Sequence, residues 1–192
     1  MVLSTSLSKT AAVAGAMAVL PELPTIFTTG FTSRIGAALG NRPNHFYMTG
    51  SMGLALTVGA GVALSARRPV LVLDGDGSLL MNPGGLICAG GMVDLPLIHV
   101  VLDDGCYDST GGQRSPAPQV DLVGWAVAAG WRSVRTVDTL DGLTAALGLV
   151  YRELAGPAFI RCLIEPDSTP PPPRITDDLL GVARRFTRHL TA

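Results

Sequence analysis

The chain has 192 residues, of which 47% are hydrophobic and 15% charged, and its formal net charge is −1. This length and composition are typical of one globular domain with a large buried core, and they exclude a disordered chain. The near-neutral charge also argues against general binding to nucleic acid or to an acidic membrane, because no basic excess exists to neutralise phosphates.

A helix is predicted over residues 6–20, because Ser6 or Ser8 can cap its start and Pro21 follows its end. Its apolar stretch resembles a signal-peptide core, but it is short for a membrane span, so we predict a core-facing helix and no membrane association. The next expected elements follow from β-branched, aromatic and glycine patterns: a strand over 25–30, a helix over 32–40, a short strand running into a glycine turn over 46–53, and a small-residue helix over 54–66.

Two continuous apolar runs, PVLVLDGDG (69–77) and LPLIHVVLDDG (95–105), are typical of parallel strands covered on both faces. A helix interrupted by glycines is expected between them, over 83–93, and a polar Gly/Pro-containing loop follows over 107–118. The remaining expected elements are a helix over 122–130, a strand over 133–137, a helix over 139–154, a strand over 158–165 and, after Pro170–Pro173, a helix over 176–190.

This alternation predicts an α/β fold, a three-layer, mostly parallel sheet with helices on both faces. Residues 1–168 are expected to form one domain, and residues 169–192 a proline-rich linker with a C-terminal docking helix. The three cysteines show no metal-binding spacing, which favours reduced thiols and a cytoplasmic protein. Lys9 is the only lysine, and we interpret this as compositional bias.

Both apolar runs end in acidic residues and glycine. Asp76 lies between Gly75 and Gly77, where glycines permit positive φ and close ligand approach, and Ser78 adds a hydroxyl near a helix start, where amides favour an anion. Asp104 closes the second run. Because ligands bind outside the carboxyl ends of such strands, the two carboxylates predict a Mg²⁺–diphosphate site. The alternative is a pair of ordinary Asp-Gly turns.

The segment GDGSLLMNPGGLICAGGMVDLPLIHVVLDDG (75–105) resembles the signature of thiamine diphosphate enzymes. Neither a P-loop nor a GxGxxG dinucleotide motif is present. The segments TTGFTSR (28–34), NHFYMTGSMG (44–53) and DDGCYDSTGGQ (103–113) are similar to those of phosphonopyruvate and sulfopyruvate decarboxylases. The likeness extends from about residue 6 to the C-terminal helix and covers the diphosphate-binding, PP-type domain of those enzymes.

The resemblance implies that Mg²⁺ is held by Asp76, Asp104 and the main-chain carbonyl of Cys106, with Gly77 and Ser78 on the diphosphate. The aminopyrimidine ring is expected against Gly50, Ser51 and Met52. Met52 would act as the wedge that bends the cofactor, and a core residue is the alternative. The remaining cofactor-binding positions are Thr29, Gly30, Gly75, Tyr107 and Asp108.

The loop after the second apolar run is expected to border the substrate, through Tyr107, Asp108, Ser109, Thr110 and Gln113; a solvated turn is the alternative. Arg34 and His45 are expected near cofactor-facing strand ends, where they could meet a phosphonate or sulfonate; a surface or structural role is the alternative. His99, inside an apolar run, is expected to be a core residue.

Two features depart from the family pattern. Asp104 stands where the family usually has asparagine, and we expect metal binding to survive this change. The glutamate that activates the cofactor ring lies on a pyrimidine-binding domain of the family, and Glu22, Glu153 and Glu165 match no such motif. The chain is therefore expected to be the β subunit of a two-subunit enzyme, with a pyrimidine-binding α subunit as partner in an α2β2 assembly.

The expected activity is decarboxylation of phosphonopyruvate or a similar small anionic 2-oxo acid. One alternative is a carboligase or acyltransferase with chemistry like that of acetolactate synthase. The shape of the pocket decides whether the enamine intermediate is protonated or attacks a second carbonyl, and the sequence does not reveal this shape. A further alternative is a non-catalytic cofactor-binding subunit. No role in nucleic-acid binding is expected.

Overall fold

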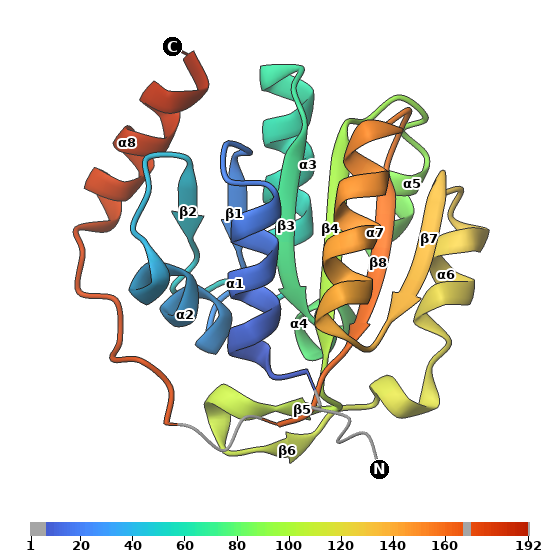
Figure 1. The fold of residues 1–192 in the computed structure, drawn as a ribbon, viewed down its shortest axis with the longest axis horizontal. Coiled ribbons are helices and arrows are strands. Elements are labelled where there is room, and N and C mark those ends of the chain that lie inside the picture. The colour runs from blue at the N-terminus through green and yellow to red at the C-terminus, as the bar shows by residue number, and fades with distance from the viewer. Residues whose placement is uncertain (1–6, 167–169, 192) are drawn as a thin grey trace.

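The computed structural model describes residues 7–166 and 170–191. Six parallel strands form the main sheet, in the order β2-β1-β3-β4-β8-β7 (Figure 1). The predicted parallel α/β sheet is therefore confirmed. The strands are β1 (Thr25–Phe27), β2 (His45–Tyr47), β3 (Val70–Gly75), β4 (Leu97–Asp103), β7 (Ser133–Val137) and β8 (Ala158–Leu163).

Helices cover both faces of this sheet, as the alternating pattern predicts (Figure 1). One face packs against α1 (Lys9–Val19), α2 (Phe31–Leu39) and α7 (Leu140–Arg152). The other face packs against α3 (Ala55–Ala66), α5 (Gly84–Gly90) and α6 (Leu122–Ala128). The central strands β3 and β4 are buried almost throughout, because helices exclude water from both of their faces.

The N-terminal helix α1 begins directly after Ser8, which caps it. The side chain of Ser8 accepts a hydrogen bond from the amide of Ala11, so Ser8 is the N-cap of α1. The alternative cap, Ser6, lies outside the described residues. The apolar side chains of α1 face the core, and no helix in the described part of the chain is both long and apolar enough to cross a membrane.

The strands predicted over 25–30 and 158–165 were too long at their carboxyl ends, whereas the short strand running into a glycine turn over 46–53 is confirmed. β1 ends at Phe27 rather than residue 30, because Gly30 adopts a φ of 93° and begins the turn into α2. β2 ends at Tyr47, and residues 48–54 form an irregular segment in which Ser51 and Gly53 have positive φ. Both irregular segments lie at the carboxyl edge of the sheet, where the chain leaves the strands.

The segments after the two apolar runs contain structure that the sequence patterns did not reveal. A short helix, α4 (Asp76–Met81), begins directly at Asp76. The expected loop over 107–118 contains a small hairpin of β5 (Cys106–Tyr107) and β6 (Gln113–Arg114), which lies below the carboxyl ends of the main strands in Figure 1. One-turn 3₁₀ helices occupy 108–110 and 117–119.

The C-terminal segment packs against the edge of its own chain. The helix α8 (Leu179–Thr191) lies beside β2, and its buried Phe186 contacts the ring of Phe46 at a centroid distance of 5.5 Å (Figure 1). The guanidinium of Arg34 donates hydrogen bonds to the carbonyls of Pro171 and Pro172. These contacts place the proline-rich segment and α8 over the β2 edge of the sheet.

Candidate functional site

The carboxyl ends of β1, β3 and β4 surround a small cavity. The chain goes from β1 to β2 on one side and returns to β3 on the other, so this is the point where the strand order reverses and where open α/β sheets bind ligands. Most of the predicted cofactor residues line the cavity, so the topology brings them together. They are Thr29, Met52, Gly75, Asp76, Gly77, Ser78, Asp104, Cys106, Tyr107 and Asp108.

The remaining predicted cofactor residues lie around this cavity. Gly30 lines a second cavity that shares Thr29 and Ser109 with the first. Gly50 and Ser51 are exposed on the irregular segment after β2. Met52, on the same segment, is half-buried and lines the first cavity. The predicted ring-binding residues therefore lie on the open side of the site.

Asp76 carries a buried negative charge. Its carboxylate accepts a hydrogen bond from the hydroxyl of Ser115, and burial, helped by the nearby Asp103 and Asp104, raises the pKa of Asp76 to about 6. No cation among the described residues forms an ion pair with Asp76. A divalent cation with hard oxygen ligands fits this position, because it would supply the missing positive charge.

The two aspartates at the end of β4 have different partners. Asp103 pairs with Arg161 of β8 at 2.7 Å, so its charge is compensated within the sheet. Asp104 turns toward the cavity and pairs with the ammonium of Lys9, also at 2.7 Å. The side chain of Asp104 is 1% exposed, which places this ion pair in the interior.

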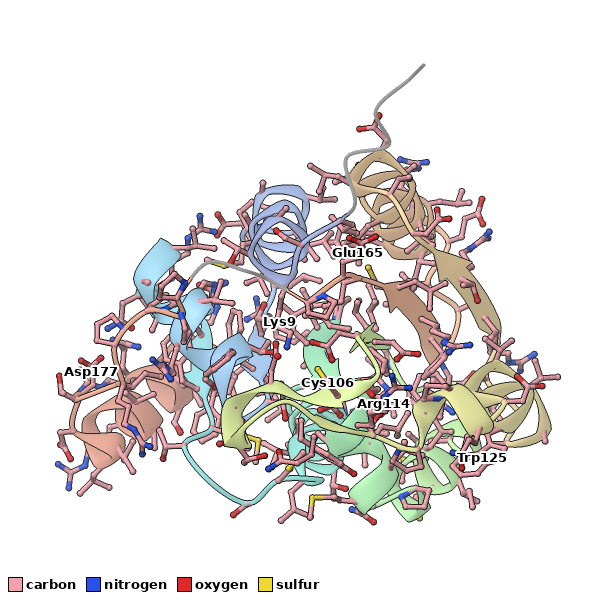
Figure 2. All side chains as sticks on the ribbon, turned by 90° about the horizontal axis from the view of Figure 1, so that it is seen from below. Lys9, Cys106, Arg114, Trp125, Glu165 and Asp177 are labelled. Atoms are coloured by element: carbon pink, nitrogen blue, oxygen red, sulfur yellow. The ribbon has the colours of Figure 1, made fainter. Side chains whose placement is uncertain are left out.

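A second acidic residue shares the Lys9 ammonium. Asp108 lies 2.9 Å from Lys9 Nζ, and this contact lowers the pKa of Asp108 against the opposing effect of its partial burial. Burial alone would lower the pKa of Lys9, but the two carboxylates raise it, so the ammonium stays charged. Lys9 thus joins the start of α1 to both β4 and the hairpin, and Figure 2 shows it beside the hairpin that carries Cys106 and Arg114.

Cys106 brings a thiol close to these carboxylates. One ligand atom from each of Asp104, Cys106 and Asp108 lies within 4.8 Å of the others. Burial and the two acidic neighbours raise the pKa of the Cys106 thiol to about 12, so the sulfur stays protonated and is a poor ligand. A hard cation here would take oxygen ligands, which is consistent with the expected use of the main-chain carbonyl.

Ser78 connects three parts of the site. Its hydroxyl lies 3.0 Å from that of Thr28 at the end of β1, and it accepts a hydrogen bond from the amide of Gly53. The side-chain amide of Asn82 donates to the carbonyl of Gly53. The segment that carries Gly50, Ser51 and Met52 is therefore anchored at its end to the helix that begins with Asp76.

The glycines on either side of Asp76 do not adopt the positive φ that the sequence suggested. Gly75 has a φ of −115° and Gly77 lies in α4, so neither uses the positive φ that glycine permits. Gly77 instead permits a close contact, because a Cβ there would lie 2.3 Å from the ring of Tyr107. The cavity is about 50 Å³, enough for a few water molecules.

The predicted substrate loop is the outer part of the hairpin. Ser109 lies over Gly30, where a Cβ would come within 2.8 Å of its hydroxyl oxygen. Thr110 and Gln113 are exposed and hydrogen-bond to each other, Thr110 Oγ1 lying 3.0 Å from Gln113 Oε1. Ser109 therefore reaches both cavities, whereas Thr110 and Gln113 stabilise the turn from outside.

Arg34 lines the second cavity, which is about 250 Å³ and also contains Arg174. The guanidinium of Arg34 stacks on Phe31, 5.0 Å from the ring centroid. His45 does not reach either cavity: it lies at the first residue of β2, at the opposite edge of the sheet, and contacts Gly40 and Tyr47. His99 is the predicted core residue, buried beside Asp74 at 3.2 Å.

The three glutamates lie away from this site. Glu22 and Glu153 are exposed at the amino-terminal edge of the sheet, before β1 and after α7. Glu165 follows β8 at the carboxyl edge, but it is exposed and does not line either cavity. Within the described residues, no glutamate therefore lines either of the two cavities.

Sequence reasoning missed three residues of the site: Lys9, Thr28 and Ser115. Thr28 lies inside the TTGFTSR segment that carried the resemblance, so that segment did hold a signal for it. Ser115 follows the hairpin, and Lys9 opens a helix far from the motifs in sequence. Neither belongs to a recognisable motif, and only the fold brings them to the carboxylates.

Comparison with known proteins matches residues 28–162 to the family described as "Thiamine pyrophosphate enzyme, C-terminal TPP binding domain". Phosphonopyruvate decarboxylase of Streptomyces viridochromogenes is 44% identical over 176 residues, which cover 90% of this chain and 44% of that protein. The chain thus spans less than half the length of this relative. Sulfopyruvate decarboxylase subunit beta of Methanothermobacter thermautotrophicus is 39% identical over 172 residues, covering 90% of this chain and 89% of that subunit.

Solved structures show the same fold. The crystal structure of benzoylformate decarboxylase from Polynucleobacter necessarius matches with a TM-score of 0.69 and 24% identity, over 81% of this chain and 33% of that one. A putative thiamin diphosphate-dependent enzyme from Mycobacterium smegmatis matches with a TM-score of 0.70 and 21% identity, over 86% of this chain and 34% of that one.

Proposed function

The chain belongs to the thiamine pyrophosphate enzymes, as their C-terminal TPP-binding domain, and from this premise we propose that it is the diphosphate- and Mg²⁺-binding β subunit of a two-subunit 2-oxo acid decarboxylase. The proposed substrate is phosphonopyruvate or a similar anionic 2-oxo acid. The observation that carries the proposal is the convergence of Asp76, Ser78 and Asp104 on one cavity at the point where the strand order reverses.

The proposed metal site consists of the carboxylates of Asp76 and Asp104 with the main-chain carbonyl of Cys106. The uncompensated charge of Asp76 supports it, since a cation would relieve that charge. Gly77 and Ser78 would hold the diphosphate, and Met52 would lie against the pyrimidine ring. When bound, the cofactor supplies the electron sink that lets the carboxylate of a 2-oxo acid leave as CO₂.

An anionic substrate is supported by the second cavity. Arg34 and Arg174 line it, and it shares Thr29 and Ser109 with the proposed cofactor cavity. Two arginines in one cavity favour a substrate with a phosphonate or sulfonate group, because arginine binds such oxyanions with its planar set of donors. Arg34 also donates to the carbonyls of Pro171 and Pro172, so it would exchange these partners for the substrate. The names of the relatives, phosphonopyruvate and sulfopyruvate decarboxylases, point to the same chemical class.

A partner is proposed because the three glutamates lie away from the site. The partner would be a pyrimidine-binding α subunit that supplies the activating glutamate and covers the exposed residues Gly50 and Ser51, in an α2β2 assembly. The match to a subunit named beta over 89% of its length supports this arrangement. A cytoplasmic location is part of the proposal and is supported by the three free cysteines.

The test is product analysis with the chain and its candidate α subunit, given pyruvate and phosphonopyruvate with thiamine diphosphate and Mg²⁺. Release of CO₂ and an aldehyde by the pair, and by neither chain alone, is the expected result. A branched or acyl-transfer product would indicate a carboligase or acyltransferase instead. Cofactor binding without turnover would indicate a non-catalytic subunit.

The matched variants are Asp76→Asn and Asp94→Asn. Asp76 lines the cavity, whereas Asp94 is exposed and lies outside it. The first substitution should abolish Mg²⁺-dependent cofactor binding and turnover, and the second should leave both unchanged. Full activity of Asp76→Asn would contradict the proposed metal site.

A further inference from the structure

Lys9 is the single lysine of the chain and the first residue of α1. Its ammonium lies 2.7 Å from Asp104 and 2.9 Å from Asp108, and its side chain is 10% exposed. It also lines the cavity that contains Asp76 and Ser78. The ammonium is therefore part of the proposed metal and diphosphate site rather than of the protein surface.

Local structure does not explain this position. The first turn of a helix carries a partial positive charge, which disfavours a cation there, and burying a long lysine side chain costs rotamer freedom. Ser8 already caps the helix. The placement of Lys9 is thus accounted for by the two carboxylates that it contacts, on β4 and on the hairpin.

The contact between Lys9 and the carboxylates changes the net charge of the cavity. Asp76, Asp104 and Asp108 contribute three negative charges to one cavity, and a bound diphosphate would add more. The Lys9 ammonium, which Asp104 and Asp108 share, cancels one of the three, so that the site carries the net charge of two carboxylates. This is the charge expected where asparagine, rather than aspartate, follows the β4 strand.

We propose that Lys9 is a positioning residue of the metal and diphosphate site: its ammonium orients the Asp104 carboxylate and offsets its charge, so that the cavity accepts both a divalent cation and an anionic diphosphate. The inference rests on the proposed function, because it concerns the same site. It explains how the chain uses aspartate at position 104, and it assigns a role to the only lysine.

The test compares Lys9→Met, Lys9→Arg, Asp104→Asn and the double variant Lys9→Met/Asp104→Asn, each in the full chain with its partner subunit. Two affinities are measured separately. Thiamine diphosphate is titrated by calorimetry at saturating Mg²⁺, and Mn²⁺ is titrated without cofactor and followed by its EPR signal. Thermal midpoints without ligands report on folding.

Lys9→Met makes the cavity more negative, so its thiamine diphosphate affinity should fall about tenfold or more, whereas its Mn²⁺ affinity should be unchanged or higher. Asp104→Asn should weaken Mn²⁺ binding. Lys9→Arg keeps the charge and should stay close to wild type. The double variant restores the charge balance, so it should recover thiamine diphosphate binding and most of the thermal midpoint lost in Lys9→Met.

Different results would overturn the inference about Lys9 and the proposed function. Equal losses of both affinities in Lys9→Met would indicate a purely structural lysine and overturn the inference. A double variant that fails to recover cofactor binding would indicate a direct contact between Lys9 and the diphosphate, which also overturns it. A wild-type complex that binds neither ligand would overturn the proposed function itself, and the inference with it.

Discussion

The side-chain hydroxyls of Thr28 and Ser78 lie 3.0 Å apart, although fifty residues separate them in the sequence. They join the end of β1 to the first turn of α4, across the point where the strand order reverses. The same Ser78 oxygen accepts the amide of Gly53. One hydroxyl thus fixes the relative position of three segments that line the candidate site.

Substituting Ser78 by alanine should therefore destabilise the chain. The change leaves the buried amide of Gly53 and the hydroxyl of Thr28 without this partner, at a cost of about 1–3 kcal/mol. Thr28→Val is the matched control, because it removes one hydroxyl while Ser78 keeps the Gly53 amide, and it should cost less. Urea unfolding measures both, and equal losses would contradict the central role of Ser78.

The contact between Gly77 and Tyr107 predicts that the effect of Gly77→Ala on stability depends on the Tyr107 ring. The substitution should destabilise the chain when the ring is present and not when it is removed. A Cβ at position 77 would lie 2.3 Å from the Tyr107 ring, so Gly77→Ala should cost about 1–3 kcal/mol through overpacking. In a Tyr107→Ala background the clash is gone, and alanine should be neutral or stabilising because it favours the helix. A double-mutant cycle from urea unfolding gives the coupling, and a Gly77→Ala cost that persists without the ring would show that another contact limits the position.

The α3 helix offers a matched pair of glycines. A Cβ at Gly59 would lie 2.2 Å from Val72 of β3, whereas a Cβ at Gly61 would meet nothing within 4 Å. Gly59→Ala should therefore cost about 1–3 kcal/mol or more, because helix and sheet must separate. Gly61→Ala should stabilise the chain by up to about 1 kcal/mol through helix propensity. Thermal denaturation distinguishes the two, and stabilisation by both would mean that the α3–β3 contact is looser than described.

His45 should make the fold sensitive to acid. Burial and the nearby Arg42 and Arg185 lower its pKa from 6.5 to about 4, despite a hydrogen-bonding contact with the carbonyl of Gly40. The other near group is the hydroxyl of Tyr47, at 2.9 Å. Because the folded pKa lies below the unfolded one, the unfolded state binds the proton more tightly, and stability falls as pH drops from about 6.5 to about 4.

The full effect of this shift is on the order of 3 kcal/mol, reached below about pH 4. Urea unfolding of wild type and His45→Phe at pH 7, 5.5 and 4.5 measures it. The wild-type curve should lose more stability than the variant over this range. Parallel curves would show that other groups cause the acid sensitivity.

The sequence predicted the architecture because its signals are local. Continuous apolar runs such as 69–77 and 95–105 indicate strands covered on both faces, and their alternation with helical patterns leaves few topologies open. The same logic placed Asp76 and Asp104 at one edge of the sheet. Positions inside strands and helices were well predicted, whereas the end of β1 and the hairpin after β4 were not, because there a glycine turn and long-range contacts decide the conformation.

By itself, the sequence determined the family, the parallel sheet and the acidic residues at two strand ends, since each depends on residue type and spacing along the chain. Only the tertiary structure decided what surrounds those residues. Lys9 meets Asp108 across 99 residues of sequence, and Ser115 reaches Asp76 across 39. Such contacts have no local pattern, because a buried charge needs a partner in space and the fold alone determines which side chain arrives there.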